Sequence, residues 1–589
     1  MTTAKQYDYL NRLGSISSAP ATSFNYQYNS ANQRTTAKLA DGSYWQFGYD
    51  ALGQVTSGNR YWPDGTLVAG QQFGYSFDTI GNRTQTQTGG DQTGAGLRIA
   101  NYTNNALNQI TSRDVPGDVD IMGLAIPTGT VTVNGQPAYR RGEYFRAQLP
   151  VANAAASVWQ SITNSVPGTN VTGHKYVVKT PEQFSYDADG NLTNDGRWAY
   201  AWDAENRLTS MTSISNAPSA PVEQIVYAYD YMSRRVQKTL SMTNVQGGWA
   251  PTYTDLYVYD GWNCIAMLNP AQSLQESFLW DSDLSGSMQG AGGAGGVGGL
   301  IEATYYGTAT TNCFAAFDGN GNVSALINAA DGTAAAQYEY GPFGELIRAT
   351  GPMAKLNPFR FSTKYEDDET DLLYYGFRYY NPSTGRWLGR DPGQEQGGMN
   401  LYNFVGNDAI DQFDELGLLT MSDVNNAYDL FASQVNGKPC CCSQPVQWSL
   451  NLTGTASGST VTLTAHTPTP GNPDCLLAIN DYFWWNCVSA QNDFIASGGT
   501  LLQIAFGNQS WHDYGFYLGG STDTETHTGH SGWWAQMTDA NHWDFYVIVF
   551  FTRCQNGKTL AGKDQSNDVQ FNWNQVNHKH GPTTGYWSN

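Results

Sequence analysis

The sequence predicts a mostly β protein, and three observations support that prediction. The 589 residues include 64 Gly and 36 Tyr but only 14% charged residues, a composition that suits short strands joined by turns. A short unit built on an aromatic residue followed by Asp or Asn recurs along the chain. The length predicts several domains or a repeat array. No run of about 18 apolar residues is present, so we expect no membrane span.

The net charge of −21 bears on partners and location. Because phosphate groups are bound by clustered Lys and Arg, we expect the repeat region to bind no nucleic acid. The charge suits a soluble extracellular surface, and we expect a secreted or cell-surface protein. The start, MTTAKQYDYLNRLG, has no apolar signal core. This leaves two expectations: export without a cleaved signal, or a chain that is the downstream part of something longer.

Residues 1–113 are the first predicted repeat region. The unit recurs about every 25 residues, a spacing typical of arrays in which each unit buries its apolar face against its neighbours. We expect each strand to end at the aromatic residue, a turn with Asp, Gly or Asn to follow, and the next strand to start with a β-branched residue. The units begin at Tyr7-Asp8, Tyr28-Asn29, Tyr49-Asp50, Phe77-Asp78 and Tyr102.

Residues 114–182 interrupt the repeat. Alternating patterns such as TVTVNGQPAYRR, with a hairpin turn at Asn134-Gly135, predict a small inserted β-sandwich-like module. The alternative is a decorated pair of ordinary repeats. The repeat resumes over residues 183–340, with units at Tyr186-Asp187, Trp202-Asp203, Tyr229-Asp230 and Tyr259-Asp260.

Two stretches could be mistaken for a phosphate-binding and a Ca²⁺-binding site, but their sequences disfavour both. Residues 286–299, GSMQGAGGAGGVGG, lack the Gly-Lys-Ser/Thr of a phosphate loop, and we expect a flexible surface loop. The acidic run 366–369 in KYEDDETD lacks the alternating donors and central glycine of a Ca²⁺ loop, and we expect a solvated loop. No cofactor is predicted.

The stretch from Phe377 to Leu418 ends the repetitive part, since the composition changes after it. Together with the units before it, this stretch resembles the RHS/YD-repeat family of bacterial proteins. The similarity covers nearly all of residues 1–418 and lies in YDALGQVTS, FSYDADGNLT, WDAENRLTSM, FDGNGNVSAL, YEYGPFGE, LLYYGFRYYNPSTGRWLGRDP and GGMNLYNFVGND. The resemblance implies a β-ribbon that spirals into a hollow shell, plugged by an RHS-associated core domain at residues 341–418.

The resemblance also implies self-cleavage after a closing Asp-Pro-x-Gly-Leu motif, which frees a variable C-terminal domain, often a toxin, inside the shell. In this sequence the motif has Glu415 in place of Pro, and Asp408 likewise stands where Pro is usual. The implied catalytic residues are Arg378, Asp391 and Asp414, and the implied bond joins Leu418 to Leu419.

The chemistry of two aspartates fits such a cut. Two carboxylates brought close together cannot both ionise cheaply, so one acts as a base toward water and the other as an acid. The permanent charge of Arg378 would orient a carboxylate or the peptide oxygen. The alternative is structural: Asp391 and Asp414 as turn residues and Arg378 as an ion-pair partner. Only a fold can bring together two aspartates 23 positions apart.

Residues 419–589 carry no recognised motif. We expect one amphipathic helix in MSDVNNAYDLFASQV, a hairpin in VQWSLNLTGTASGSTVTLTAHT and a buried strand in WDFYVIVFFTRCQ, hence an α+β or mostly β domain. Five Lys and Arg against twelve Asp and Glu disfavour a nuclease.

Polar residues of this domain suggest weaker candidate sites. The sharpest pairs are His512 with Asp513 and His542 with Asp544, which we retain as a candidate effector-domain site. His527, His530 and the run Cys440 to Cys442 could bind zinc, but no closed ligand spacing is present, so no metal site is predicted. Structural disulfides and surface histidines are the simpler interpretation.

Two functions follow from these expectations. The first is an RHS-type polymorphic toxin-like protein, whose shell holds its own C-terminal domain as enclosed cargo and releases it against a competitor or host cell. Its further partners would be an immunity protein and an upstream shell segment or partner chain. The second is a non-catalytic extracellular scaffold or adhesin, whose tail, with nine of the eighteen Trp residues, binds cell-surface carbohydrate.

Overall fold

The computed structural model describes residues 1–19, 22–166, 168–214, 217–244, 247–284, 296–392, 400–414 and 416–417, and beyond them the backbone of strands between residues 447 and 586. The chain divides into two compact units, one of Met1–Asp391 with Gly398–Leu418 and one of Pro392–Gly397 with Leu419–Asn589. The predicted mostly β fold class is confirmed, because the described part holds antiparallel sheets and only short 3-10 turns.

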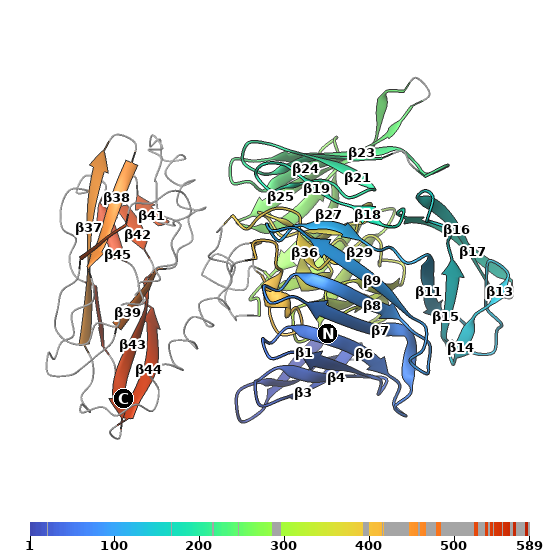
Figure 1. Cartoon of the computed structure of the whole chain (residues 1–589), viewed down its shortest axis with the longest axis horizontal. Helices are drawn as coiled ribbons and strands as arrows, with labels where there is room; N and C mark the ends of the chain where they lie inside the picture. The colour runs from blue at the N-terminus through green and yellow to red at the C-terminus, as the bar shows by residue number, and fades with distance from the viewer. Residues whose placement is uncertain are drawn as a thin grey trace. The chain divides into compact units, whose positions relative to one another are not determined.

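The first large sheet holds eleven strands in the order β1 to β10, followed by β18. Figure 1 shows β1 to β9 side by side as one twisted sheet. Strands that follow each other in sequence are hydrogen-bonded neighbours, as a repeat of hairpins requires. Their bounds are β1 (Thr2–Tyr7), β2 (Leu13–Ala19), β3 (Thr22–Tyr28), β4 (Arg34–Leu39), β5 (Tyr44–Tyr49), β6 (Val55–Tyr61), β7 (Leu67–Phe77), β8 (Arg83–Gly89), β9 (Leu97–Asn104), β10 (Ile110–Arg113) and β18 (Glu182–Gln183).

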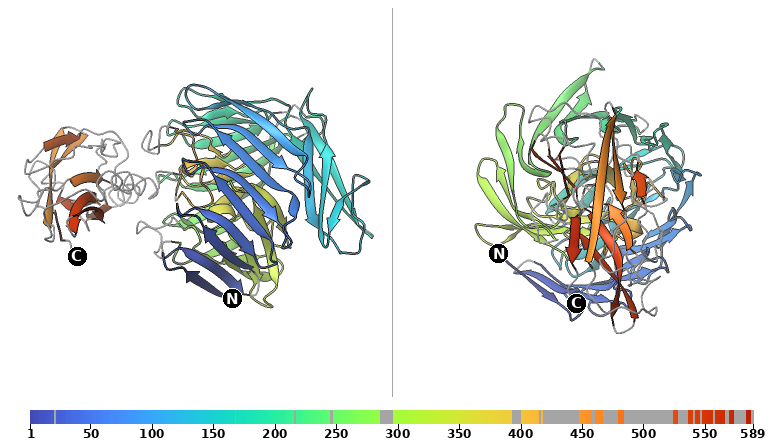
Figure 2. Two further views of the ribbon diagram at one scale, coloured as in Figure 1. Left: turned by 60° about the horizontal axis from the view of Figure 1, so that its bottom comes forward. Right: turned by 90° about the vertical axis from the view of Figure 1, so that its left-hand side faces the viewer.

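The segment between β10 and β18 forms two small antiparallel sheets, ordered β11-β15-β14 and β13-β12-β16-β17. Val131, Val133 and Phe145 form a core of their own there. The strands are β11 (Asp118–Leu124), β12 (Thr132–Val133), β13 (Gln136–Pro137), β14 (Tyr139–Arg141), β15 (Tyr144–Pro150), β16 (Val158–Val166) and β17 (Thr169–Val177). Figure 2 shows these strands projecting beside the first sheet.

The second large sheet holds fourteen strands, β19 to β32, again in sequence order. It continues to Thr350, beyond the boundary at residue 340 that the sequence suggested. Its strands are β19 (Ser185–Tyr186), β20 (Leu192–Asn194), β21 (Trp198–Trp202), β22 (Leu208–Ser213), β23 (Glu223–Tyr229), β24 (Arg235–Thr243), β25 (Trp249–Asp260), β26 (Asn263–Leu268), β27 (Leu274–Trp280), β28 (Leu300–Tyr306), β29 (Thr310–Phe317), β30 (Val323–Asn328), β31 (Ala334–Tyr340) and β32 (Leu346–Thr350).

After the second sheet come a small sheet and two 3-10 turns. The sheet is β33 (Tyr365–Asp367), β34 (Leu372–Tyr374), β35 (Tyr379–Asn381) and β36 (Arg386–Trp387), and the turns are η1 (Phe361–Thr363) and η3 (Val405–Asn407). We call the described residues 386–391, 400–414 and 416–417 the closing segment. Its Arg386 donates to the carbonyl of Gly81 in the first sheet at 3.1 Å, and its Tyr402 hydroxyl donates to the carbonyl of Gly190 in the second at 2.7 Å. The closing segment therefore contacts both large sheets.

The C-terminal unit is described through its strands alone. Strands β37 (Gln447–Ser457) and β38 (Thr460–His466) pair antiparallel, which confirms the predicted hairpin. The predicted strand in WDFYVIVFFTRCQ is divided between β42 (His542–Phe545) and β43 (Val547–Gln555), whereas the predicted helix lies outside the described residues. The other strands are β39 (Ile479–Phe483), β40 (Thr524–His527), β41 (Gln536–Asp539), β44 (Lys558–Gln565), β45 (Val569–Asn572) and β46 (Thr583–Tyr586).

One turn geometry explains the repeated unit. After β5, Asp50 Oδ1 accepts the backbone N–H groups of Leu52 and Gln54, both at 2.9 Å, and Oδ2 accepts the Gln54 amide at 2.7 Å. Gly53 has φ +87°, a conformation that favours Gly or Asn. An acceptor side chain at the first position and a residue that tolerates positive φ at the fourth account for the motif. Two backbone hydrogen bonds close the turn, from the Asp50 N–H to the Gln54 carbonyl and from the Gly53 N–H to the Asp50 carbonyl, and the same pair recurs in the turns starting at Asp8, Asn29, Asp78, Asn105, Asp187, Asp203, Asp230, Asn269 and Asp318.

The aromatic residue before each turn links neighbouring units. The Tyr49 hydroxyl donates to the carbonyl of Arg34, the residue after the preceding turn, at 2.8 Å. Equivalent bonds join Tyr28 to Leu13, Trp202 to Leu192, Tyr229 to Leu208, Tyr259 to Arg235, Trp280 to Cys264 and Tyr340 to Val323. In the predicted units the strands end at the aromatic residue or one residue after it, except at Tyr102, where β9 continues to Asn104. The expected β-branched start is found at Val55, Ile110 and Val323 but not at most others.

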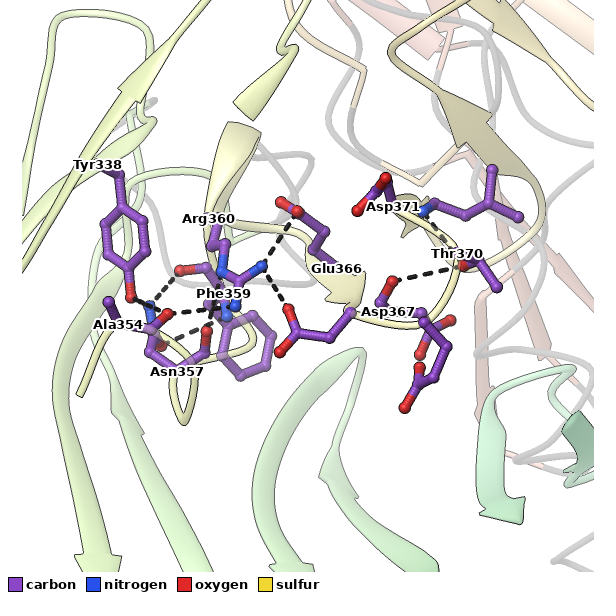
Figure 3. A network of polar contacts seen from close by, with 12 residues as sticks. Tyr338, Ala354, Asn357, Phe359, Arg360, Glu366, Asp367, Thr370 and Asp371 are labelled. Carbon is purple, nitrogen blue, oxygen red and sulfur yellow. Dashed lines mark hydrogen bonds and ion pairs between the residues drawn. The ribbon is translucent and has the colours of Figure 1, made fainter. Parts of the chain in front are cut away.

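The interpretation of residues 366–369 as a solvated loop was wrong for Glu366 and Asp367, whereas Asp368 is exposed. Asp367 is 0% exposed in β33 and pairs with Arg235 at 2.7 Å and Lys238 at 3.1 Å. Buried Glu366 pairs with Arg360 at 3.0 Å (Figure 3). Burial alone would raise the pKa of Asp367, but the charges of Arg235 and Lys238 hold it below its ordinary value. The sequence could not reveal these partners, since Arg235 and Lys238 lie on a different sheet.

In the described part of the chain, no helix is long and apolar enough to cross a membrane. Cys264 and Cys313 are both buried free thiols.

Candidate active site

The three residues that the resemblance singles out come from three separate places in the chain. Arg378 ends the loop between β34 and β35, where the N–H of Tyr375 donates to the Arg378 carbonyl at 3.0 Å. Asp391 follows β36, and its N–H donates to the carbonyl of Leu401 at 2.9 Å. Asp414 follows η3 on the closing segment. All three are buried, with exposed fractions of 5%, 7% and 2%.

Arg378 joins the two aspartates. Its Nη2 lies 2.8 Å from Asp391 Oδ2 and 3.4 Å from Asp414 Oδ2. Its Nε donates to the carbonyl oxygen of Gly417 at 2.6 Å. The structure thus brings together the three predicted residues, and it attaches the arginine to the backbone directly before Leu418.

Asp414 also shapes the chain that follows it. Its Oδ1 accepts the N–H of Leu416 at 3.1 Å and of Gly417 at 2.7 Å. The N–H of Phe377 donates to the carbonyl of Leu416 at 3.0 Å. Gly417 has φ +75°, and a Cβ there would lie 3.0 Å from the backbone nitrogen of Arg378. The N–H groups and the carbonyl groups of residues 416 and 417 are therefore all hydrogen-bonded. The positive φ at position 417 favours glycine.

Two aromatic residues enclose the charges, and sequence reasoning did not single them out. The guanidinium of Arg378 lies 4.1 Å from the centre of the Trp387 ring, a cation–π arrangement. Tyr375 packs edge-on against Trp387 with ring centres 5.1 Å apart. Burial raises the pKa of Tyr375 well above its usual value, and the Asp414 carboxylate raises it further, so Tyr375 stays neutral. Both aromatic residues lie in the stretch LLYYGFRYYNPSTGRWLGRDP, so the family resemblance of that stretch could have pointed to them.

The arrangement provides two carboxylates on one permanent positive charge, in a site closed to bulk water. Such a pair can share proton-transfer work, one as base and one as acid. Within the described residues, no group of three or more His, Cys, Asp or Glu side chains could hold a metal ion.

The structure does not describe the side chains of the remaining predicted site residues. Leu418, Leu419, Glu415, His512 and Asp513 lie outside the described residues. His542 and Asp544 lie on β42, of which only the backbone is described.

In sequence, the chain is similar to several toxin proteins. The chain is 30% identical over 224 residues to the tRNA3(Ser)-specific nuclease WapA of Bacillus spizizenii, a match that covers 37% of this chain and 8% of the relative. It is 25% identical over 428 residues to the toxin subunit YenC1 of Yersinia entomophaga, covering 66% of this chain and 42% of the relative.

Among solved structures, the crystal structure of TcdB2-TccC3-Cdc42 matches with a TM-score of 0.34 and 16% identity, over 72% of this chain and 21% of that one. No protein-family model matches the chain. The matches to WapA and YenC1 span less than half of those relatives' lengths.

Proposed function

We propose that this chain is a delivered, toxin-like protein that cuts its own bond between Leu418 and Leu419 and frees residues 419–589 as an effector. The observation that supports the cut is the buried cluster of Arg378, Asp391 and Asp414, with Arg378 bonded to the carbonyl of Gly417 at 2.6 Å. The toxin relatives support the effector role of the freed domain.

In the proposed reaction, one aspartate takes a proton from a water molecule, whose oxygen attacks the carbonyl carbon of Leu418. The other aspartate gives a proton to the Leu419 nitrogen as the C–N bond breaks. Arg378 has two tasks. It balances the charge of the carboxylates, and through the Gly417 carbonyl it fixes the backbone one residue before the bond. Asp414 contributes a third contact by holding the N–H groups of Leu416 and Gly417.

The test is a denaturing gel of the purified full chain, with N-terminal sequencing of the smaller product. We expect fragments of about 418 and 171 residues from the 589-residue chain, the smaller starting at Leu419. Asp414→Asn and Asp391→Asn should each abolish the cut, because neither amide can exchange the proton. Asp371→Asn is the matched control, since the Asp371 side chain is 62% exposed and outside the site.

A single full-length band from the wild-type chain under all conditions contradicts self-cleavage. That result, combined with carbohydrate binding that is lost when tryptophans of residues 419–589 are substituted, would favour the scaffold or adhesin function instead. Enclosure of the freed domain has its own measurement: both fragments should co-elute in gel filtration, and the smaller should resist added protease until the larger is denatured.

A further inference from the structure

A second buried cluster, which does not include Arg378, joins the closing segment to the first sheet. We call Arg34 of β4, Tyr49 of β5 and Asp411 the clasp. Asp411 Oδ2 accepts the backbone N–H of Arg34 at 2.8 Å and lies 3.0 Å from the Tyr49 hydroxyl. Arg34 Nη1 donates to the carbonyl of Ile410 at 2.9 Å. The side chains of Arg34 and Asp411 are only 10% and 13% exposed.

The second large sheet holds the same stretch from another side. Asn320, in the turn between β29 and β30, is 4% exposed. Its amide nitrogen donates to the carbonyls of Ala409 at 3.0 Å and Gln412 at 3.2 Å. Residues 409–412 are therefore fixed by side chains from both sheets, directly before Asp414.

Packing acts together with these tethers. Ala409 is 1% exposed in a hydrophobic cluster against which Ile410 also packs. A pocket of about 110 Å³ lies beside them, lined among others by Arg34, Asn320 and Ile410. Residues 408–417 contain no strand or helix in their described positions, so their position depends on this packing and on side-chain hydrogen bonds from both sheets.

We propose that Arg34 is a positioning residue for the cut, and that cleavage is thereby coupled to folding of the N-terminal strands. The proposal rests on the self-cleavage proposed above and concerns its regulation. Arg34 and Asp411 are 377 positions apart, so the clasp forms only when β4 and β5 lie against the closing segment. Until then Asp414 has no fixed place beside Arg378, and a misplacement of about 1 Å costs about a hundredfold in rate.

The test uses full-length chains made by cell-free synthesis, with the first-order rate of cleavage followed on denaturing gels. Arg34→Met should slow the cut tenfold or more. The matched control is Arg12→Met, the same substitution in the preceding turn, where the arginine pairs with Asp8 at 2.7 Å and lies over the ring of Tyr28. This control should cut within about twofold of the wild-type rate.

Two further measurements separate positioning from general destabilisation. Arg34→Lys keeps a charge toward Asp411 and should recover part of the rate. Tyr49→Phe and Asn320→Ala each remove one tether, and each should slow the cut at a temperature well below the variant's own melting midpoint. If Arg34→Met fails to fold, these two variants decide the matter.

The outcomes distinguish the two proposals. A wild-type chain that never cuts overturns the proposed function, and this inference with it. A wild-type chain that cuts, with folded Arg34→Met, Tyr49→Phe and Asn320→Ala chains that cut at the same rate, overturns the inference and leaves the proposed function intact.

Discussion

At the scale of single residues, the candidate site depends on one glycine as much as on its charges. Gly417 has a φ of +75°, and a Cβ added there would lie 3.0 Å from the backbone nitrogen of Arg378. The carbonyl of Gly417 accepts a hydrogen bond from Arg378 Nε. A side chain there would push the backbone away from the guanidinium. The geometry of the site therefore depends on having glycine at position 417.

Gly417→Ala should therefore slow self-cleavage by at least about tenfold, because Arg378 would lose the held carbonyl. Gly406→Ala is the control. Gly406 also has a positive φ of +64°, but an added Cβ would meet nothing within 4 Å. It should lower stability by about 1 kcal/mol and leave the cut unchanged. Equal cleavage rates in both variants, measured by gel time course, would refute the steric argument.

Asp367→Asn should lower the free energy of unfolding by about 3 to 5 kcal/mol, because it leaves the charge of Arg235 buried without its carboxylate partner and leaves Lys238 with Glu369 alone. Denaturant titration measures it. Asp368→Asn, next in sequence but 46% exposed, should cost about 1 kcal/mol or less. The pKa of Asp367 is lowered, so its contribution is full above the unfolded value of about 4 and declines as pH falls below it. A loss of stability no larger than that of Asp368→Asn would contradict the buried-pair account.

At the scale of elements, the repeated turn is the unit of construction. One acceptor side chain, as at Asp50, satisfies two backbone N–H groups and the side chain at the fifth position. Because the side-chain oxygens of Asn29, Asn105 and Asn269 accept the same two backbone N–H groups, the turn requires a side-chain acceptor and not a charge.

Asp50→Ala should cost about 1 to 2 kcal/mol of stability, since two backbone N–H groups lose their acceptor. Asp50→Asn should lower the stability much less, by a small fraction of the loss in Asp50→Ala, because Asn supplies an equivalent side-chain oxygen. The comparison is made by denaturant unfolding of the full chain. If the Asn and Ala variants are equally destabilised, the charge matters and the acceptor argument is wrong.

At the scale of the whole N-terminal unit, the closing segment contacts both large sheets. Its Asp408 carboxyl group is buried in an environment that disfavours the charged form. Burial, and next the nearby charge of Asp411, raise the pKa of Asp408 to about 8. Between the unfolded value of about 4 and this folded value, the native state holds a proton that the unfolded state has released. Stability should therefore fall as pH rises across this window, by at most about 1.4 kcal/mol per pH unit, and level off above it.

Asp408→Asn should remove that dependence, giving a flatter stability profile between pH 5 and 8 and a more stable protein at the upper end. Denaturant titrations at unit pH intervals measure it. Asp331→Asn, an exposed turn residue whose carboxyl bonds only within its own turn, should keep the wild-type slope. An unchanged slope in Asp408→Asn would show that another group carries the pH dependence.

The sequence alone carried the local features of this protein. An aromatic residue, an Asp or Asn, and a Gly or Asn at fixed offsets specify a strand end and a turn, because the hydrogen bonds involved join residues within five positions of each other. The mostly β class and the ends of most strands that carry the motif followed from this. The three candidate site residues came from the resemblance, whereas spacing alone could not have joined Asp391 to Asp414.

Tertiary structure decided every feature that depends on distant partners. The acidic run at 366–369 looks solvated in sequence, yet Asp367 is buried because Arg235 and Lys238, from another sheet, neutralise it. The place of Arg378 between two aspartates, and its bond to Gly417, likewise exist only after the small sheet and the closing segment have folded. Hydrogen bonds and ion pairs act over a few ångströms, so only the packed chain determines which charges meet.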